Sequence, residues 1–210
     1  MNLQERLRTN PTEFKWTILI LTLYSRIDKL YDLLAELYKQ CQQSERKSIQ
    51  ILWLGDNYSL ITGDKRNAIL SLARGKYISF IDDDDMIAPD YISKIREAID
   101  QEPEVITFQV EKTIEGQRDK TQLFKKEHAG NYTKVDRAAK RKYQKMLPNH
   151  LCIWRRDLIK TAFPPNMKSE DLKWADKMDQ FYSKEGQHHI DQVLYYYQFS
   201  RKTTETQQRR

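Results

Sequence analysis

Stretches with the apolar pattern of a buried strand alternate with stretches of helical period through the first 110 residues. The β-branched apolar run at residues 16–24 predicts a strand, and apolar residues at helical spacing from Ile27 to Cys41 predict an amphipathic helix after it. Further strands are expected at residues 49–54, 77–81 and 105–110, and further helices at about 65–73 and after Pro89. Such alternation favours right-handed βαβ units. We therefore predict an α/β, Rossmann-like fold with a mostly parallel central sheet flanked by helices.

The second half of the chain has a different pattern. Residues 111–146 are charged and poor in apolar side chains, which predicts an excursion of loops or a hairpin. Regular structure is expected again at residues 151–154, in a helix near residues 170–182 and in a strand at residues 193–199.

The composition is that of a globular protein with a modest positive charge. The 210 residues include 36 Lys and Arg and 30 Asp and Glu, which gives a net charge of +6. Four of those bases lie in the last ten residues, so the remainder lacks the dense basic face of a dedicated nucleic-acid binder. We therefore expect no nucleic-acid partner.

Cysteine usage and the absence of a long apolar segment predict a soluble cytoplasmic protein. Cys41 and Cys152 are too few for a disulfide framework, and the polar N-terminus lacks the apolar core of a secretory signal. The longest apolar run, at residues 16–24, is about half as long as a membrane span requires. We expect no membrane span and a monomer.

Four consecutive aspartates, Asp82 to Asp85, follow the apolar strand expected at residues 77–81. Adjacent carboxylates repel one another when they are desolvated, and ligands of open α/β sheets bind beyond the carboxyl ends of the strands. Mg²⁺ and Mn²⁺ prefer carboxylate oxygens. Because successive strand residues point to opposite faces, Asp82 and Asp84 could converge on one cation. An acidic loop or the N-terminus of a helix is the structural alternative.

Two bases lie in the first turn of the helix expected at residues 65–73. Lys65 and Arg66 follow Gly63 there, although the helix dipole favours acids at that end. Because departures from local rules are typical of functional sites, these side chains could contact a diphosphate or brace the aspartates. A solvated basic turn is the alternative. The residues of this helix that we expect to face the core are Ile69, Leu72 and Ala73.

Polar residues also follow the first two expected strands. Asp56, with Asn57 beside it, could accept a hydrogen bond from a base or from a ribose hydroxyl, or could form a turn. Thr22 and Tyr24 end the first strand and could pack around a base or cap the strand. Because the carboxyl ends of parallel strands meet at one edge of a sheet, these residues are expected beside the aspartates.

Candidate acid–base groups occur in the second half. Ser169 is a plausible helix N-cap, and the carboxylates of Glu170 and Asp171 would stabilise the first turn after it. The functional alternative is a general base aimed into the crevice. His150 could line an acceptor pocket, whereas a structural role is favoured for the histidines at 188–189.

Taken in order along the chain, these motifs resemble the family 2 glycosyltransferases of the GT-A fold. The most specific part is Arg-Asn at 66–67, followed by Ala-Arg-Gly at 73–75 and Tyr-Ile-Ser-Phe-Ile-Asp-Asp-Asp-Asp at 77–85. The other matching segments are residues 22–24, 55–57, 170–171 and 193–197. The likeness extends over about residues 14–200. Viral enzymes of the chlorella-virus type, in which this domain begins a longer chain, are similar as well.

The resemblance implies a glycosyltransferase whose donor is a nucleoside-diphosphate sugar, with a UDP-sugar expected. The donor-binding residues that it implies are Thr22, Leu23, Tyr24, Asp56, Lys65, Arg66, Asp82 and Asp83. Among these, Asp56 would contact the base, and Lys65 and Arg66 would lie near the ribose or the phosphates.

The same resemblance assigns roles to the acids. Asp82 corresponds to the first acid of the family's Asp-x-Asp motif, near the ribose, and Asp84 to the acid that holds Mn²⁺ or Mg²⁺, with Asp82 as a second metal residue. Asp171 corresponds to the general base that takes a proton from the acceptor hydroxyl in a single, inverting displacement. Three features depart from the family's pattern: a fourth aspartate, an aspartate at the variable position 83, and the lack of a clear histidine after the last strand.

The resemblance also divides the chain. It implies an N-terminal extension at residues 1–13, a GT-A domain at 14–200 and a polar basic tail at 201–210. Within the domain, residues 14–110 would bind the nucleotide, and residues 111–200 would bind the acceptor and carry the base. The acceptor is expected to be a glycan or a protein-linked sugar.

Two other classes of function are compatible with these residues. A nucleotidyltransferase or a metal-dependent phosphatase also uses strand-end aspartates, although aspartate-nucleophile phosphatases commonly carry theirs after the first strand and this cluster follows the third. A carbohydrate- or nucleic-acid-binding module with an inactive transferase fold is the non-catalytic alternative. The spacings of the P-loop and of the dinucleotide-binding fingerprint are absent from the sequence.

Overall fold

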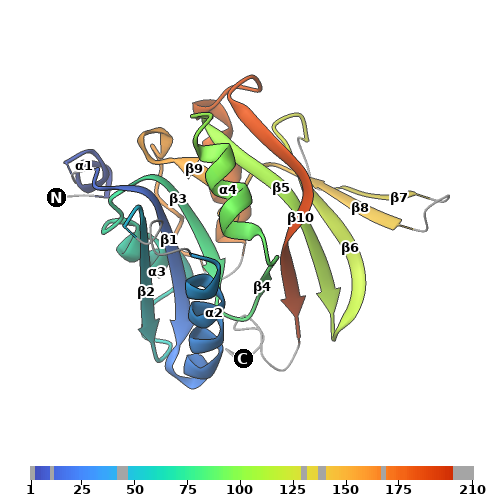
Figure 1. Ribbon diagram of the computed structural model, residues 1–210, viewed down its shortest axis with the longest axis horizontal. Coiled ribbons are helices and arrows are strands. Elements are labelled where there is room, and N and C mark those ends of the chain that lie inside the picture. The colour runs from blue at the N-terminus through green and yellow to red at the C-terminus, as the bar shows by residue number, and fades with distance from the viewer. Residues whose placement is uncertain are drawn as a thin grey trace.

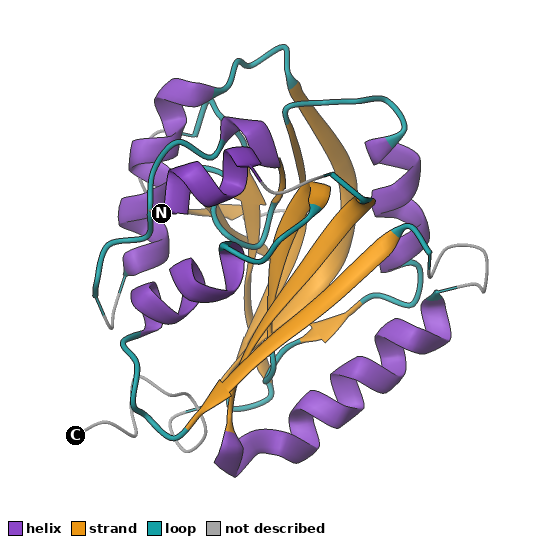
Figure 2. Ribbon diagram, turned by 90° about the vertical axis from the view of Figure 1, so that its left-hand side faces the viewer, coloured by secondary structure: helices purple, strands orange, loops and turns teal. Residues whose placement is uncertain are grey.

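The computed structural model describes residues 3–9, 12–41, 47–128, 132–136, 141–166 and 169–200. Within these residues, one ten-stranded sheet forms the centre of the protein, and helices pack on both of its faces (Figures 1 and 2). This mixed α/β architecture confirms the predicted fold class. The tail expected at residues 201–210 lies outside the described residues, and the predicted domain limits stay a prediction.

The first half of the chain forms three parallel strands with helical connections. The strands are β1 (Phe14–Leu23), β2 (Ile49–Asp56) and β3 (Gly75–Asp82), in the order β2-β1-β3. Leu21 of β1 lies opposite Asp82 of β3, and Leu23 of β1 lies opposite Asp56 of β2. The register therefore brings the polar ends of these strands to one edge of the sheet, as the sequence predicted.

The helices of this half cover the two faces of the sheet. They are α1 (Leu3–Thr9), α2 (Ile27–Gln40), α3 (Thr62–Leu70) and α4 (Tyr91–Ile99). Helices α2 and α4 lie on the face toward the viewer in Figure 1, and α3 lies on the other face. Ile69 and Ala73 are buried as expected, but the prediction for Leu72 is wrong, because α3 ends at Leu70 and Leu72 is 54% exposed in the turn that follows.

The second half extends the sheet with mostly antiparallel strands. Its elements are β4 (Met86–Ile87), β5 (Val105–Ile114), β6 (Gln117–Phe124), β7 (Tyr132–Asp136), β8 (Arg141–Met146), β9 (Ile153–Arg155), β10 (Gln187–Phe199) and helix α5 (Glu170–Met178). The full order is β2-β1-β3-β9-β5-β6-β8-β7, with β10 paired to β5 and β4. Parallel pairs also join β10 to β5 and β8 to β6.

Residues 111–146 are more regular than the sequence indicated. β5 continues to Ile114, and a turn at Gly116, whose φ is +76°, leads into β6. Strands β7 and β8 complete the segment, so the expectation of loops is wrong and the expectation of a hairpin is confirmed. These strands need few apolar residues, because only alternate side chains such as Phe124 and Met146 reach the core.

Candidate functional site

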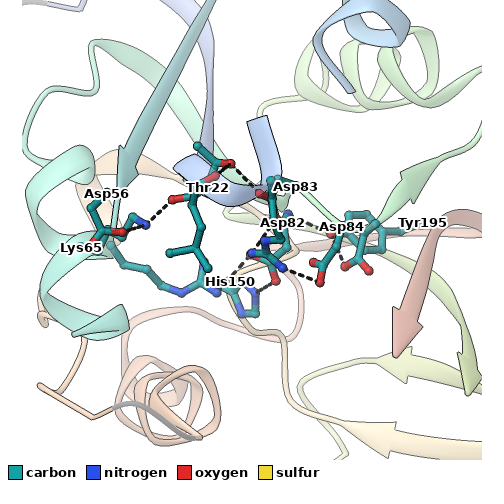
Figure 3. Close-up of polar contacts among 12 residues, drawn as sticks. Thr22, Asp56, Lys65, Asp82, Asp83, Asp84, His150 and Tyr195 are labelled. Atoms are coloured by element: carbon teal, nitrogen blue, oxygen red, sulfur yellow. Dashed lines mark hydrogen bonds and ion pairs between the residues drawn. The ribbon is translucent and has the colours of Figure 1, made fainter. Parts of the chain in front are cut away.

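A cavity of about 490 Å³ opens at the carboxyl ends of β1 and β3, where the two halves of the chain meet. The predicted site residues that line it are Arg66, Asp82, Asp83, Asp84 and Asp171. Because ligands of α/β sheets bind at this edge, the cavity lies where the sequence predicted a site. Figure 3 shows the polar contacts that surround the aspartates.

Lys65 and Asp56 form a buried ion pair beside the cavity. The Lys65 ammonium donates to the Asp56 carboxylate and to the Thr22 carbonyl, so it joins the ends of β2 and β1 (Figure 3). Burial acts to raise the pKa of Asp56, but hydrogen bonds from Lys65 and from the N–H of Leu60 hold it below its usual range. Lys65 therefore braces the ends of β1 and β2, and not the aspartates at 82–85 that the sequence offered as its partners.

Helix α3 is also fastened to the segment that leads toward α5. The Asn67 side chain exchanges two hydrogen bonds of 2.9 Å with the backbone of Phe163. Gly63 allows this close approach, because a Cβ at that position would lie 1.9 Å from the carbonyl oxygen of Pro164. The Gly-Asp-Lys-Arg-Asn motif at 63–67 thus connects α3 to the ends of β1 and β2 and to the segment at residues 163–164.

Arg66 joins the aspartate cluster to the acidic pair at the start of α5. Its guanidinium lies 3.2 Å from Asp82 and 3.2 Å from Glu170, and 5.0 Å above the centre of the Phe80 ring. Burial acts to lower the pKa of Arg66, but the carboxylates of Asp82, Glu170 and Asp171 raise it on balance. Within the described structure its Nη1 atom is buried without a hydrogen-bond partner, so this cavity-lining side chain has a donor to offer a ligand.

Arg26 neutralises the middle of the aspartate cluster. It lies in the turn after β1 and contacts Asp83 at 2.7 Å and Asp84 at 2.8 Å, and Thr22 donates to Asp83 at 2.6 Å. Burial raises the pKa of Asp83 to about 6 against the opposing effect of Arg26, and burial also raises the pKa of Asp84. Arg26 was not predicted as a site residue, although a base two residues after Tyr24, just beyond the strand end, was a visible signal.

The first and last aspartates have different partners. Tyr195 of β10 donates from its hydroxyl to Asp85 at 2.7 Å and accepts from the N–H of Asp82 at 3.1 Å (Figure 3). Burial and the charges of Asp84 and Asp82 raise the pKa of Asp85 well above its usual range. Burial acts the same way on Asp82, but Arg66 and His150 hold its pKa below the usual range. The cluster therefore keeps Asp82 ionised and disfavours charge on its neighbours.

His150 lies between the aspartate cluster and the predicted base. Its Nε2 atom is 3.5 Å from Asp82, and its Nδ1 atom is 3.7 Å from Asp171. The ring is 5% exposed, and neither nitrogen has a hydrogen-bond partner within the described residues. The sequence placed His150 in an acceptor pocket, and the cavity includes it, but the sequence did not reveal that it connects these two carboxylates.

Helix α5 is positioned by aromatic packing. Trp174 stacks on Phe163 with 4.6 Å between ring centres and meets the edge of Trp154 at 5.4 Å. Ser169 is the N-cap residue of α5, as predicted, but it adopts a left-handed backbone with φ of 58° and its side chain makes no capping hydrogen bond. This conformation is uncommon outside glycine, and it lies directly before the acidic pair whose second member, Asp171, faces the cavity.

The other predicted donor-binding residues lie at the strand ends or, for Lys65, on α3, and none of them lines the cavity. Thr22, Leu23 and Lys65 are buried, whereas Tyr24 is 61% exposed. The Tyr24 ring lies beside Gly55, since a Cβ on that glycine would be 3.0 Å from it. An exposed aromatic ring beside the end of β2 is available to a planar ligand.

The carboxylates offer oxygen ligands but no complete metal cage. Among the described residues, no group of three or more His, Cys, Asp or Glu side chains could hold a metal ion by itself. Mg²⁺ commonly binds through one or two carboxylates together with substrate phosphates, so Asp82 and Asp84, which both line the cavity, fit such a cation. His189 lies 2.9 Å from the Thr107 hydroxyl, in agreement with the structural role expected for it.

Comparison with known proteins gives a consistent result. The family model described as Glycosyl transferase family 2 matches residues 5–163, which leaves Glu170 and Asp171 beyond its end. No curated protein matches the chain. None of the described helices is long and apolar enough to span a membrane.

Solved structures of TarS from S. aureus share the fold. TarS 1–349 is 19% identical with a TM-score of 0.60, over 88% of this chain and 60% of that one. Its complex with UDP-GlcNAc is 17% identical with a TM-score of 0.60, over 89% and 59% of the two chains, and a longer TarS chain is matched over 37% of its length. The chain thus spans less than two thirds of these proteins. Because the family model covers most of the chain and the fold agrees, this protein belongs to glycosyl transferase family 2 and has the GT-A fold.

Proposed function

We propose that the protein transfers a hexose or deoxyhexose from a UDP-sugar to a hydroxyl group of a glycan or another acceptor, with inversion at the anomeric carbon. The observation that carries this proposal is that one cavity brings the strand-end aspartates together with Asp171. The UDP-GlcNAc complex of TarS supports UDP-sugars as the donor class.

The nucleoside is proposed to bind over the ends of β1 and β2. The exposed ring of Tyr24 would stack on the base, and the Asp56 carboxylate, fixed by Lys65, would accept from it. The free Nη1 donor of Arg66 would contact a phosphate oxygen from inside the cavity. In this arrangement Thr22, Leu23 and Asp83 support the site from below through their buried contacts.

A Mn²⁺ or Mg²⁺ ion is proposed to accompany the donor. Asp84 and Asp82 would hold it, and when bound it would neutralise charge on the departing diphosphate. Arg26 already supplies one positive charge to Asp83 and Asp84, so it limits the negative charge that the site presents to a diphosphate.

Asp171 is proposed as the general base. Its side chain is 25% exposed and lines the cavity, so its carboxylate can meet an acceptor hydroxyl. It takes the hydroxyl proton, the acceptor oxygen forms a bond to the anomeric carbon, and the bond to UDP breaks with its electron pair on the phosphate oxygen. Because one displacement occurs, the anomeric configuration inverts. Glu170, held by Arg66, and the nearby His150 fix the start of α5 and with it the base.

The test measures donor binding and transfer separately. Calorimetric titration of UDP with Mn²⁺ and with chelator should show micromolar, metal-dependent binding to the wild type and to Asp171→Asn. Screening UDP-sugars by hydrolysis and by transfer should then show activity that Asp171→Asn loses. Asp176→Asn, an exposed carboxylate on the same helix, is the matched control and should stay active. Transfer by Asp171→Asn would remove Asp171 as the base, and a wild type that binds no nucleoside diphosphate would overturn the proposal.

A further inference from the structure

Two lysines lie opposite each other on the cavity wall that the second half of the chain supplies. Lys112 of β5 pairs with Lys120 of β6, and Tyr197 of β10 pairs with Lys112 from the other side. Residues directly opposite in neighbouring strands project from the same face of a sheet. All three side chains line the cavity, so they form one row, which we call the lysine row.

This arrangement is unfavourable for the fold itself. Like charges that lie directly opposite in a sheet destabilise it. On the other face of the same strands, Arg118 pairs with Glu111 at 2.9 Å, so these strands accommodate oppositely charged partners elsewhere. Residues that break a local rule beside a cavity are candidates for ligand binding.

The positive charge of the lysine row is only partly neutralised. Asp119 lies 3.4 Å from the Lys120 ammonium and offsets one of the two charges. The Lys112 ammonium lies 5.1 Å from the centre of the Tyr197 ring and 5.6 Å from that of Phe199, and no described carboxylate comes within 4 Å of it. Burial, followed by the charge of Lys120, lowers the pKa of Lys112. An anion beside the lysine row would offset the repulsion between the two ammonium groups and favour the charged form of Lys112.

Uncharged groups continue the same wall. Gln122 and Gln144 lie next to the lysine row on β6 and β8, line the cavity and share a hydrogen bond of 3.1 Å. Amide groups of this kind can both donate to and accept from sugar hydroxyls. The wall therefore combines one unbalanced cation with hydroxyl-binding groups, on strands that are not those proposed to hold the nucleoside.

We infer that the acceptor is an anionic sugar or polyol, one that carries a phosphate or a carboxylate group, and that Lys112 and Lys120 bind this group. The inference rests on the proposed function, because it names the acceptor class of the same cavity. The donor diphosphate is the other source of the same chemistry, so the experiment must separate the two.

The experiment uses the full chain saturated with UDP and Mg²⁺. Matched pairs of small probes are titrated and followed by NMR: galacturonate against galactose, and glycerol 3-phosphate against glycerol. In each pair the anionic probe should bind about tenfold more tightly or better. Lys112→Gln and the double variant Lys112→Gln/Lys120→Gln should abolish this preference while the affinity for UDP stays within about twofold. Lys94→Gln, on a partly exposed position of α4 outside the cavity lining, is the control.

Thermal unfolding separates a binding role from a structural one. Because the substitution removes a like-charge contact, Lys112→Gln should melt at the same temperature as the wild type or higher. Equal binding of anionic and neutral probes, or an anion preference that survives in the double variant, would overturn the inference. A loss of UDP affinity in the lysine variants would overturn it by assigning the row to the donor. A wild type that binds no UDP would instead refute the proposed function.

Discussion

Arg66 connects the two acidic parts of the site, so its removal should destabilise the whole protein. The guanidinium is 4% exposed, and its two carboxylate partners differ in burial, with exposed side-chain fractions of 8% for Glu170 and 27% for Asp82. Removing one partner of a buried ion pair costs roughly 3–5 kcal/mol, because the remaining charge stays buried. Since Asp82 is partly solvated, we expect Arg66→Met to lower the free energy of unfolding by about 3–4 kcal/mol.

The pH dependence of this loss provides a second measurement. Arg66 contributes to holding the folded pKa of Asp82 below its unfolded value near 3.8. The stabilisation is therefore fully present above about pH 5 and is lost progressively as the pH falls through the unfolded value toward the folded pKa. Urea unfolding at pH 7 and at pH 3.5 should show a smaller penalty for Arg66→Met at the lower pH. Thermal melts at pH 7 should fall by roughly 6–16 °C for a chain of this size.

Two variants keep the reasoning about Arg66 testable. Arg66→Lys retains the charge but not the forked contact with both carboxylates, so its penalty should be intermediate. Adding Glu170→Gln to Arg66→Met should recover part of the loss, because one stranded charge is removed. A penalty for Arg66→Met below about 1 kcal/mol at pH 7, or one that is equal at both pH values, would refute the reasoning.

Three further substitutions test other contacts of the site. Replacing a helical glycine by alanine ordinarily stabilises a helix, but in Gly63→Ala the new Cβ would lie 1.9 Å from the Pro164 carbonyl oxygen. The melting temperature should therefore fall. A rise in the melting temperature would contradict the close docking of α3 against this segment. Because the raised pKa of Asp85 makes its charged carboxylate unfavourable in the folded protein, the wild type should lose stability as the pH rises from 5 to 8, whereas Asp85→Asn should not. The free energy of unfolding of the variant should gain on that of the wild type by at most about 1.4 kcal/mol per pH unit. A pH-independent difference in urea unfolding would contradict this. Because the His150 ring lies 3.7 Å from Asp171, His150→Gln should slow sugar transfer by roughly 10–100-fold with little change in UDP affinity. Initial rates measure the first effect and calorimetry the second. An unchanged rate would show that His150 does not position the base.

The sequence predicts best those elements whose apolar residues form a clear pattern, above all the fully buried strands. β1 and β3 are continuous apolar runs, and the amphipathic pattern of α2 and α4 is strong enough to assign their type and their inward faces. The extent of β6 and β8 was not predicted beyond a hairpin, because few of their residues, such as Phe124 and Met146, are apolar and buried, and most of the others are polar or charged. Their pattern does not differ from that of a polar loop unless the partner strand is known.

The functional site likewise has a part that the sequence predicts and a part that it does not. The strand-end acids were predictable because parallel strands end at one edge of the sheet, a rule that needs no tertiary detail. The partners that fix them were not predictable in this way, because His150 and Tyr195 approach Asp82 from segments 68 and 113 residues further along the chain. Sequence spacing contains no signal for such distant pairs. The lysine row could not be predicted for the same reason, because it depends on the register between β5 and β6.

Four adjacent aspartates can occupy a buried strand end only because three separate segments of the chain supply their partners. Arg26 follows β1, Arg66 belongs to α3, and Tyr195 belongs to β10, so the cluster is balanced only when these elements have packed together. Until then the carboxylates repel one another in water, where the cost is small; after packing, an unpaired member would be buried at high cost. The cluster therefore couples formation of the site to formation of the sheet. A substitution at any of these three partners should lower the free energy of unfolding more than it changes substrate specificity.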